Sequence, residues 1–133
     1  MNPAALQTIL YVEDDADIQT VAQIALEVVG GFTLQTCSSG REAIAVATSG
    51  FQADLLLLDV MMPEMDGPTT LGVLRQVPAT ATTPVIFMTA KVQASEVEYY
   101  QSLGAIGVIA KPFDPMLLAQ QVRALWERKD TSA

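Results

Sequence analysis

Acidic side chains directly follow two of the most apolar runs in the sequence. Asp59 ends a run of four leucines, and Glu13 and Asp14 follow the run Thr8–Val12. Apolar runs without polar alternation predict strands that are buried on both faces, as in a parallel sheet. The carboxyl ends of parallel strands form the edge at which open α/β proteins bind ligands. We therefore expect these three carboxylates to lie close together, although an aspartate at a strand end can also simply cap a loop.

A hydroxyl group and an ammonium group end the next two apolar runs. Thr89 ends the run 85–89, and Lys111 follows the run 106–110. Neighbouring carboxylates raise one another's pKa unless a cation joins them, and Mg²⁺ suits a site of few carboxylates plus waters. Thr89 and Lys111 would then bind an anion such as a phosphoryl group, and Asp59 would be placed to attack phosphorus and carry an aspartyl phosphate. The alternative is a set of scattered strand-end polar groups, with Lys111 in a surface ion pair.

Short apolar runs, which predict strands, alternate along the chain with segments of helical periodicity. The predicted strands span residues 8–12, 32–37, 55–59, 85–89 and 106–110, and the predicted helices span 16–29, 40–48, 67–77, 95–103 and a last helix from Asp114-Pro115. The second strand is more polar and is expected at an edge, and Ser95 is expected to cap its helix. Such alternation implies right-handed crossovers and a parallel sheet covered on both sides. We predict a doubly wound α/β domain.

Composition and charge exclude several classes of function. The 133 residues fit a single domain, and fifteen acidic against seven basic residues give a net charge of −8, which would repel a nucleic-acid backbone. The absence of histidine excludes a phosphohistidine or a histidine base within this chain. With Cys37 as the one cysteine there is no internal disulfide, which fits a reducing, cytoplasmic setting. No segment resembles a signal peptide or a membrane span, so we expect no membrane association.

Four motifs together resemble a response-regulator receiver domain of the chemotaxis type, over about residues 6–127. They are ILYVEDD at 9–15, LDVMMPEMDG at 58–67, MTA at 88–90 and AKPF at 110–113. Each motif is weak alone, but all four in this order are very specific. The resemblance implies a flavodoxin-like fold with five parallel strands in the order 2-1-3-4-5 and five helices. Residues 1–133 would form one receiver domain with a short polar tail at 128–133.

The resemblance also implies a metal-assisted phosphorylation site. Asp59 would be the phosphoacceptor. Asp14, Asp59 and the backbone carbonyl of Met61 would bind Mg²⁺, with Mn²⁺ as a substitute, and Glu13 would act mainly through a coordinated water. Asp15 lies one residue beyond the acidic pair and is expected to start the following helix.

Four further positions would bind the phosphoryl group or transmit its presence. Thr89 would bind a phosphoryl oxygen and shift on phosphorylation, Lys111 would bridge the phosphoryl group and a carboxylate, and the small Ala90 would leave the acceptor accessible. Val108 stands where the family often has a tyrosine or phenylalanine that rotates inward. We therefore expect the response to pass mainly through residues 91–95 and the helix that carries the two tyrosines 99 and 100, of which only one can face inward.

The predicted function is that of a stand-alone receiver with no output domain after it, rather than an enzyme acting on other substrates. It would take phosphate from a sensor histidine kinase or a histidine phosphotransfer protein, lose it slowly by its own activity, and report to a downstream protein through the last two helices and the fifth strand. A phosphohydrolase with an aspartate nucleophile often needs a second aspartate two places on, where this chain has Met61. A scaffold that is never phosphorylated would not need the complete acid, threonine and lysine set.

Overall fold

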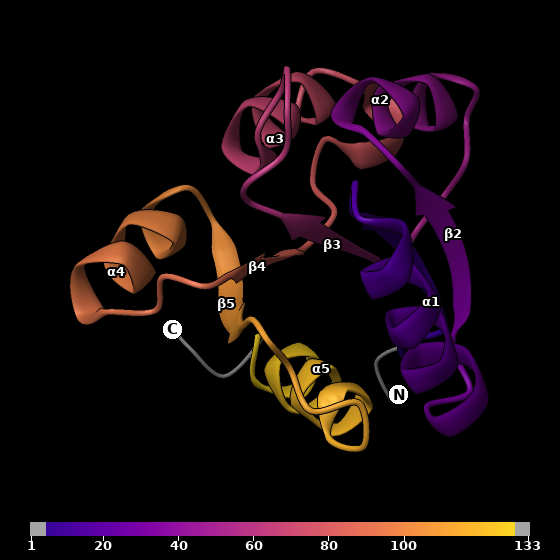
Figure 1. Ribbon diagram of the computed structural model, residues 1–133. Helices are drawn as coiled ribbons and strands as arrows, with labels where there is room; N and C mark the ends of the chain where they lie inside the picture. Colours follow the sequence, from indigo (N-terminus) through magenta and orange to yellow (C-terminus); the bar gives the residue numbers. More distant parts are fainter. Residues whose placement is uncertain (1–4, 130–133) are drawn as a thin grey trace.

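The five strands of the sheet run parallel in the order β2-β1-β3-β4-β5, as predicted. The computed structural model describes residues 5–129, so the predictions for residues 1–4 and 130–133 lie outside the described residues. The strands are β1 (Thr8–Val12), β2 (Thr33–Cys37), β3 (Leu55–Asp59), β4 (Val85–Thr89) and β5 (Ala105–Ala110). The polar strand β2 lies at an edge of the sheet, where its partly exposed side chains are tolerated (Figure 1).

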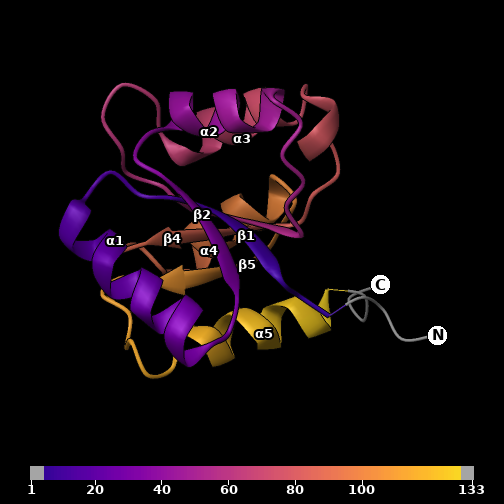
Figure 2. The ribbon, with the colours of Figure 1, turned by 90° about the vertical axis from the view of Figure 1, so that its right-hand side faces the viewer.

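Helices cover both faces of the sheet. The α-helices are α1 (Ala16–Gln23), α2 (Gly40–Thr48), α3 (Gly67–Leu74), α4 (Ala94–Ser102) and α5 (Leu118–Arg128). In Figure 2, α2 and α3 lie above the sheet, whereas α1 and α5 lie below it. A short 3₁₀ helix (Pro78–Thr80) precedes β4. The predicted doubly wound α/β fold is therefore confirmed.

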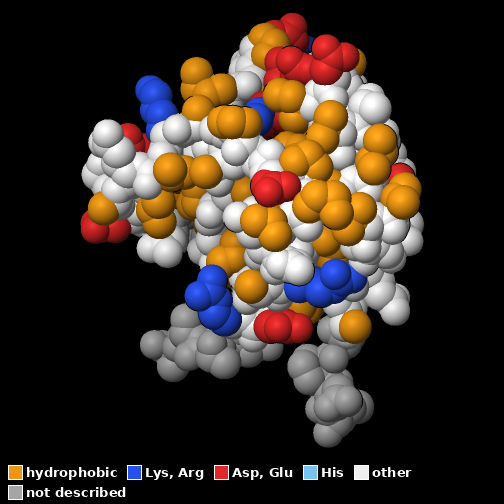
Figure 3. Space-filling model, turned by 60° about the horizontal axis from the view of Figure 1, so that its bottom comes forward, with side chains coloured by type: hydrophobic (Ala, Val, Ile, Leu, Met, Phe, Trp, Pro, Cys, Tyr) orange, Lys and Arg blue, Asp and Glu red, His pale blue; other side chains and the backbone are white. Residues whose placement is uncertain are grey.

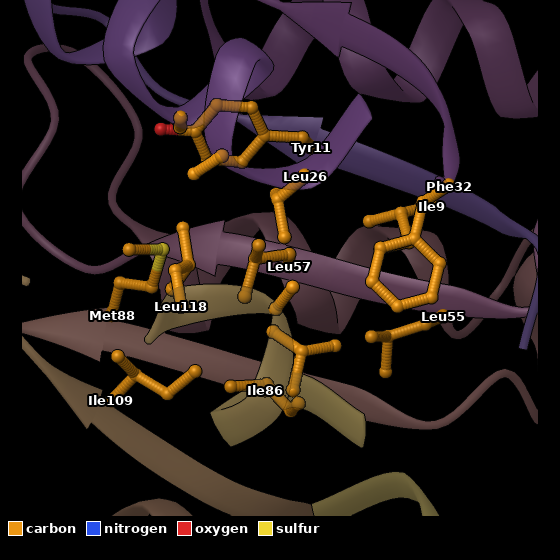
Figure 4. Close-up of a cluster of buried hydrophobic side chains, with 14 of the residues drawn as sticks. Ile9, Tyr11, Leu26, Phe32, Leu55, Leu57, Ile86, Met88, Ile109 and Leu118 are labelled. Atoms are coloured by element: carbon orange, nitrogen blue, oxygen red, sulfur yellow. The ribbon is translucent and has the colours of Figure 1, made fainter. Parts of the chain in front are cut away.

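The central strand β3 supplies both halves of the hydrophobic core. Leu55 and Leu57 pack into the cluster under α1 and α5, which Figure 4 shows, whereas Leu56 and Leu58 pack into the cluster under α2 and α3. All four leucines are fully buried. Each buried leucine contributes roughly 2 kcal/mol of transfer free energy, so the apolar run fixes β3 in the middle of the sheet.

Three helices differ from their prediction by more than one residue or in their hydrogen bonding, and of these α3 ends at Leu74 and not at residue 77. The segment 16–29 is helical throughout, but Ile24–Val29 continues α1 as a π-helix that stops at Gly30 and Gly31. The last helix begins at Leu118 and not at Asp114, because Asp114 caps a turn instead. Its Oδ1 accepts a hydrogen bond from the Met116 backbone amide at 2.9 Å, and its carbonyl accepts from the amides of residues 117 and 118.

The predicted cap of α4 is wrong. The helix begins at Ala94, with Gln93 in the N-cap position and no side-chain cap. Ser95 lies inside the first turn, where its Oγ donates to Glu96 Oε2 at 2.9 Å. The sequence signal failed because a serine near a helix start is a cap only when its backbone is still extended, and at Ser95 the helix has already begun.

Candidate phosphorylation site

Strand register brings the predicted site residues to one edge of the sheet. Val12 of β1 is aligned with Leu58 of β3, so the residues that follow them, Glu13 and Asp59, are neighbours. One carboxylate oxygen from each of Glu13, Asp14 and Asp59 can be chosen so that all three lie within 4.8 Å of one another. Glu13 and Asp59 are buried, whereas Asp14 is exposed. The expected convergence of the three carboxylates is therefore observed.

The ammonium group of Lys111 lies between the two buried carboxylates. Its Nζ is 2.8 Å from Glu13 Oε1 and 3.1 Å from Asp59 Oδ1. The Lys111 backbone amide donates to the Thr89 carbonyl at 2.9 Å, which holds the start of the β5–α5 loop beside the end of β4. Lys111 is thus part of the acid cluster and not in a surface ion pair.

Charge at the site is only partly balanced. Burial, followed by the charge of Glu13, raises the pKa of Asp59 to about 7, although Lys111 acts in the opposite direction. Burial acts to lower the pKa of Lys111, but hydrogen bonds and charge from Glu13 and Asp59 together outweigh it and raise that pKa. Three carboxylates against one ammonium leave room for a divalent cation, and oxygen ligands suit Mg²⁺.

Hydrogen bonds give the three acidic residues after β1 different roles. Asp15 is the N-cap of α1, as predicted, and its Oδ1 accepts from the amides of Asp17 and Ile18 at 2.9 and 3.1 Å. The Asp15 amide in turn donates to Glu13 Oε2 at 3.1 Å. Both oxygens of Glu13 therefore face a donor, whereas the exposed side chain of Asp14 is the member of the cluster most open to a metal ion.

The loop after β3 folds back tightly onto the strand that carries Asp59. The Gly67 amide donates to the Val60 carbonyl at 2.9 Å, and a Cβ at Gly67 would lie 2.5 Å from the Asp59 carbonyl oxygen. No residue with a side chain fits there without moving the acceptor strand. Met61, in the same loop, is 70% exposed.

At the end of β4, Thr89 is buried and Ala90 is exposed. Because Asp59 is aligned with Met88, Thr89 lies one residue further along the neighbouring strand. Its Oγ1 accepts a hydrogen bond from the Lys91 amide at 3.1 Å. The exposed Ala90 borders a pocket of about 410 Å³ that is lined by residues 90–93 and Glu96.

Near the site, the expectation of one inward-facing tyrosine is confirmed, whereas an apolar groove beside Lys111 was not predicted from the sequence. Val108 is partly buried and packs against the cluster under α2 and α3, whereas Tyr100, on α4, is buried at 6% exposure and lies next to Thr89. An apolar groove of about 230 Å³ also adjoins Lys111, and its lining comes from α1 and the β5–α5 loop: Asp17, Ile18, Val21, Lys111, Pro112 and Phe113. The two adjacent tyrosines indicated that one side chain faces inward. The groove could not be predicted in the same way, because it is formed by segments about 90 residues apart in the sequence, and no local sequence pattern reveals it.

The fold and the acid, threonine and lysine site define a class of signalling protein. The family model for the response regulator receiver domain matches residues 9–123. The chain therefore belongs to the receiver domain family of two-component response regulators, whose members accept a phosphoryl group on an aspartate. In the described part of the chain, no helix has the length and hydrophobicity that a membrane crossing requires.

Relatives and solved structures agree with this assignment. The response regulator SaeR of Staphylococcus aureus (strain USA300) is 32% identical over 120 residues, which are 90% of this chain and 50% of the relative. The chain thus spans about half the length of the curated relatives it matches. Chemotaxis protein CheY4 of Vibrio cholerae superposes with a TM-score of 0.81 at 27% identity, covering 91% of this chain and 99% of CheY4. For a putative response regulator from Chloroflexus aurantiacus J-10-fl the TM-score is 0.79 at 31% identity, and the match covers 92% of this chain and 99% of that protein's solved chain.

Proposed function

We propose that Asp59 of this receiver domain accepts a phosphoryl group from a phosphohistidine on a partner histidine kinase or phosphotransfer protein. The observation that carries the proposal is the convergence of Asp59 with Glu13, Asp14 and Lys111 at one edge of the sheet. The modified domain would then signal by changed contacts with a downstream protein. Slow loss of the phosphoryl group at the same site would reset it.

The reaction requires an ionised Asp59 oxygen as nucleophile. That oxygen would form a bond to phosphorus while the phosphorus–nitrogen bond to the donor imidazole breaks, and the imidazole nitrogen leaves with the electron pair. Lys111 Nζ, already 3.1 Å from Asp59 Oδ1, would donate to an oxygen of the arriving phosphoryl group. Thr89 would supply a second donor from β4.

Asp14, Asp59 and the Met61 carbonyl would hold Mg²⁺ or Mn²⁺, with Glu13 acting through a coordinated water. The bound ion would neutralise carboxylate charge and so favour the ionised form of Asp59, whose pKa is otherwise raised to about 7. The cluster fits such an ion because its oxygen ligands are hard and carry more negative charge than Lys111 balances.

The groove beside Lys111 is the surface on which we place the phosphodonor. Ile18 and Val21 of α1 line it, and exposed apolar side chains continue along the helix at Ile24 and Val28. Figure 3 shows hydrophobic side chains spread in several groups over the face seen from the α5 side, with acidic and basic side chains between them. The acidic surface of a chain with net charge −8 favours a donor with basic residues around its histidine.

The cytoplasmic location and the single-domain organisation over residues 1–133 remain predictions. Absence of an attached effector fits CheY4, which the match covers to 99%, but SaeR extends to about twice the matched length. Immunoblotting of a native cell extract tests the single-domain organisation. A band at 14.2 kDa supports a stand-alone receiver, and a substantially larger band contradicts it.

The phosphoacceptor is tested by incubating the protein with acetyl phosphate, with Mg²⁺ or with EDTA, and recording intact mass. Wild type should gain one phosphoryl group only with Mg²⁺, and Asp59→Asn should gain none. Asp54→Asn is a matched control, because Asp54 lies just before the same strand and binds the backbone amides of Gln7 and Thr8 at 3.1 and 3.0 Å. A phosphoryl adduct on Asp59→Asn at wild-type yield would refute the assignment.

A further inference from the structure

A glutamine of α1 holds the backbone beside the acid cluster. The carbonyl of Glu13 belongs to the peptide unit that joins Glu13 to Asp14, two members of that cluster. Gln19 Nε2 donates a hydrogen bond to this carbonyl. No backbone amide of residues 5–129 donates to it, so the Gln19 side chain takes the place of a main-chain donor. Because Glu13 is 1% exposed, its carbonyl would otherwise be a buried acceptor that lacks a partner among these residues.

Each of the other polar groups of Glu13 also has a partner. The Glu13 amide donates to the Cys37 carbonyl at 3.0 Å, across the end of β1 and β2. Oε1 accepts from Lys111 Nζ at 2.8 Å, and Oε2 accepts from the Asp15 amide at 3.1 Å. Gln19 completes this set at the carbonyl. The backbone on both sides of Glu13 is therefore held, and so is the direction in which the chain continues to the next acidic residue.

The side chain of Gln19 is itself held by a second element. An amide group has two N–H donors, and Gln19 Nε2 also donates to Ser38 Oγ at 3.1 Å. Ser38 follows β2, and its amide donates to Glu42 Oε1 at 2.6 Å in the first turn of α2. Figure 1 shows α1 alongside β2, which lets one half-buried side chain connect the ends of β1 and β2. Gln19 is thus fixed between the acid cluster and the β2–α2 loop.

We propose that Gln19 is a positioning residue that keeps the Asp14 carboxylate directed into the metal site, acting through the Glu13 carbonyl. This role rests on the proposed function, because it requires Mg²⁺ at the acid cluster. Asp14 is exposed, and the like charges of Glu13 and Asp59 favour conformers in which its carboxylate turns to solvent. A fixed peptide unit before Asp14 restricts such conformers. Without the Gln19 donor, a smaller fraction of the protein has the three carboxylates together, and the apparent Mg²⁺ affinity falls by that fraction.

The test compares Gln19→Met with Gln23→Met in calorimetric titrations with Mg²⁺. Methionine is close to glutamine in length but has no N–H donor. Gln23 lies one turn further along α1, and its Nε2 donates to Thr36 Oγ1 at 3.1 Å, so the control removes a similar bond to β2 without touching Glu13. Gln19→Met should raise the Mg²⁺ dissociation constant about tenfold, as expected for a group that orients a metal ligand, and Gln23→Met should leave it within about twofold of wild type.

Two further measurements distinguish positioning from a general loss of structure. Ser38→Ala removes the second acceptor of Gln19 and should weaken Mg²⁺ binding by a smaller factor, but it should have no further effect when added to Gln19→Met. In phosphorylation by acetyl phosphate, followed by intact mass, Gln19→Met should need about ten times more Mg²⁺ for the half-maximal rate. At saturating Mg²⁺ its rate should return to within about twofold of wild type, because Asp59 and Lys111 are unchanged.

The outcomes separate this role from the proposed function. An unchanged Mg²⁺ dissociation constant in Gln19→Met, or an equal increase in Gln23→Met, overturns the positioning role and leaves Asp59 as the acceptor. A lower maximal rate with an unchanged Mg²⁺ requirement also overturns it. If wild type binds Mg²⁺ but Asp59 takes no phosphoryl group, the proposed function fails, while weaker Mg²⁺ binding in Gln19→Met still supports the positioning role. A wild-type protein that binds no Mg²⁺ overturns both.

Discussion

Replacing Asp59 by asparagine should stabilise the metal-free protein at neutral and alkaline pH. Asp59 is 2% exposed and lies beside the buried Glu13, and Lys111 contacts both carboxylates. Burial and the charge of Glu13 raise its pKa from 3.8 to about 7. Folding therefore favours the protonated carboxyl group, and this stabilisation is fully present below about pH 3.8 and is lost as the pH rises through about 7.

The raised pKa of Asp59 determines the expected difference in stability between wild type and Asp59→Asn. At about 1.4 kcal/mol for each tenfold change in proton affinity, ionising Asp59 costs up to roughly 4 kcal/mol of folding free energy. Asparagine removes the charge and keeps an oxygen that Lys111 can bind, but its amide must also be accommodated. We expect Asp59→Asn to be more stable than wild type by about 2–4 kcal/mol at pH 8, and by about 1 kcal/mol at pH 5.

Urea unfolding in EDTA at pH 5 and pH 8 measures the difference. Added Mg²⁺ should reduce the difference in free energy of unfolding between the two proteins, because the ion binds the folded wild type more tightly than the variant. Asp54→Asn is the control and should be slightly destabilised at both pH values, because a charge-assisted acceptor for two backbone amides becomes neutral. Equal stability of wild type and Asp59→Asn at pH 8, or a difference that does not grow from pH 5 to pH 8, would refute the reasoning.

Three further substitutions test separate parts of the site. Asp14→Asn should weaken Mg²⁺ binding by tenfold or more, because it removes the exposed carboxylate of the cluster; a calorimetric titration with an unchanged dissociation constant would exclude this role. Lys111→Ala leaves the buried Glu13 without its cation and should cost roughly 2–3 kcal/mol in urea unfolding. Some phosphorylation should persist in this variant while the amide shifts caused by beryllofluoride, a phosphoryl mimic, shrink, and an unchanged shift pattern would contradict the role of Lys111. Tyr11→Phe should raise the free energy of unfolding by up to about 1 kcal/mol without affecting phosphorylation, because the hydroxyl of the fully buried Tyr11 has no hydrogen-bond partner within residues 5–129. A loss of stability in Tyr11→Phe would show that this hydroxyl is satisfied in solution.

The sequence predicted the sheet and the site because both depend on strands. Apolar runs such as that ending at Asp59 locate a buried strand within a residue or two, and strand ends in a parallel sheet meet at one edge. Knowing which residue follows each strand was therefore enough to group Glu13, Asp59 and Lys111. No property of the sequence indicated that Lys111 would contact both carboxylates, since that geometry depends on the register of four strands.

Helix ends and side-chain directions were harder to predict. Asp114-Pro115 is a sequence typical of a helix start. The Asp114 carbonyl instead accepts hydrogen bonds from two successive amides in a turn, and the helix begins only at Leu118. The change from α to π hydrogen bonding at Ile24 leaves the apolar periodicity nearly unchanged, so the pattern could not reveal it. Which of two adjacent tyrosines faces Thr89 is decided by the rotation of α4 on the sheet, which its weakly amphipathic sequence does not specify.

Mapping the phosphoryl group on the wild-type chain tests the central claim most directly. The protein is phosphorylated with acetyl phosphate and Mg²⁺ and treated at once with sodium borohydride, which reduces an aspartyl phosphate to homoserine. Peptides are then sequenced by tandem mass spectrometry. We predict homoserine at position 59 in a Mg²⁺-dependent yield, with Asp14, Asp54 and Asp66 unmodified. Homoserine at another aspartate, with Asp59 intact, would contradict the account.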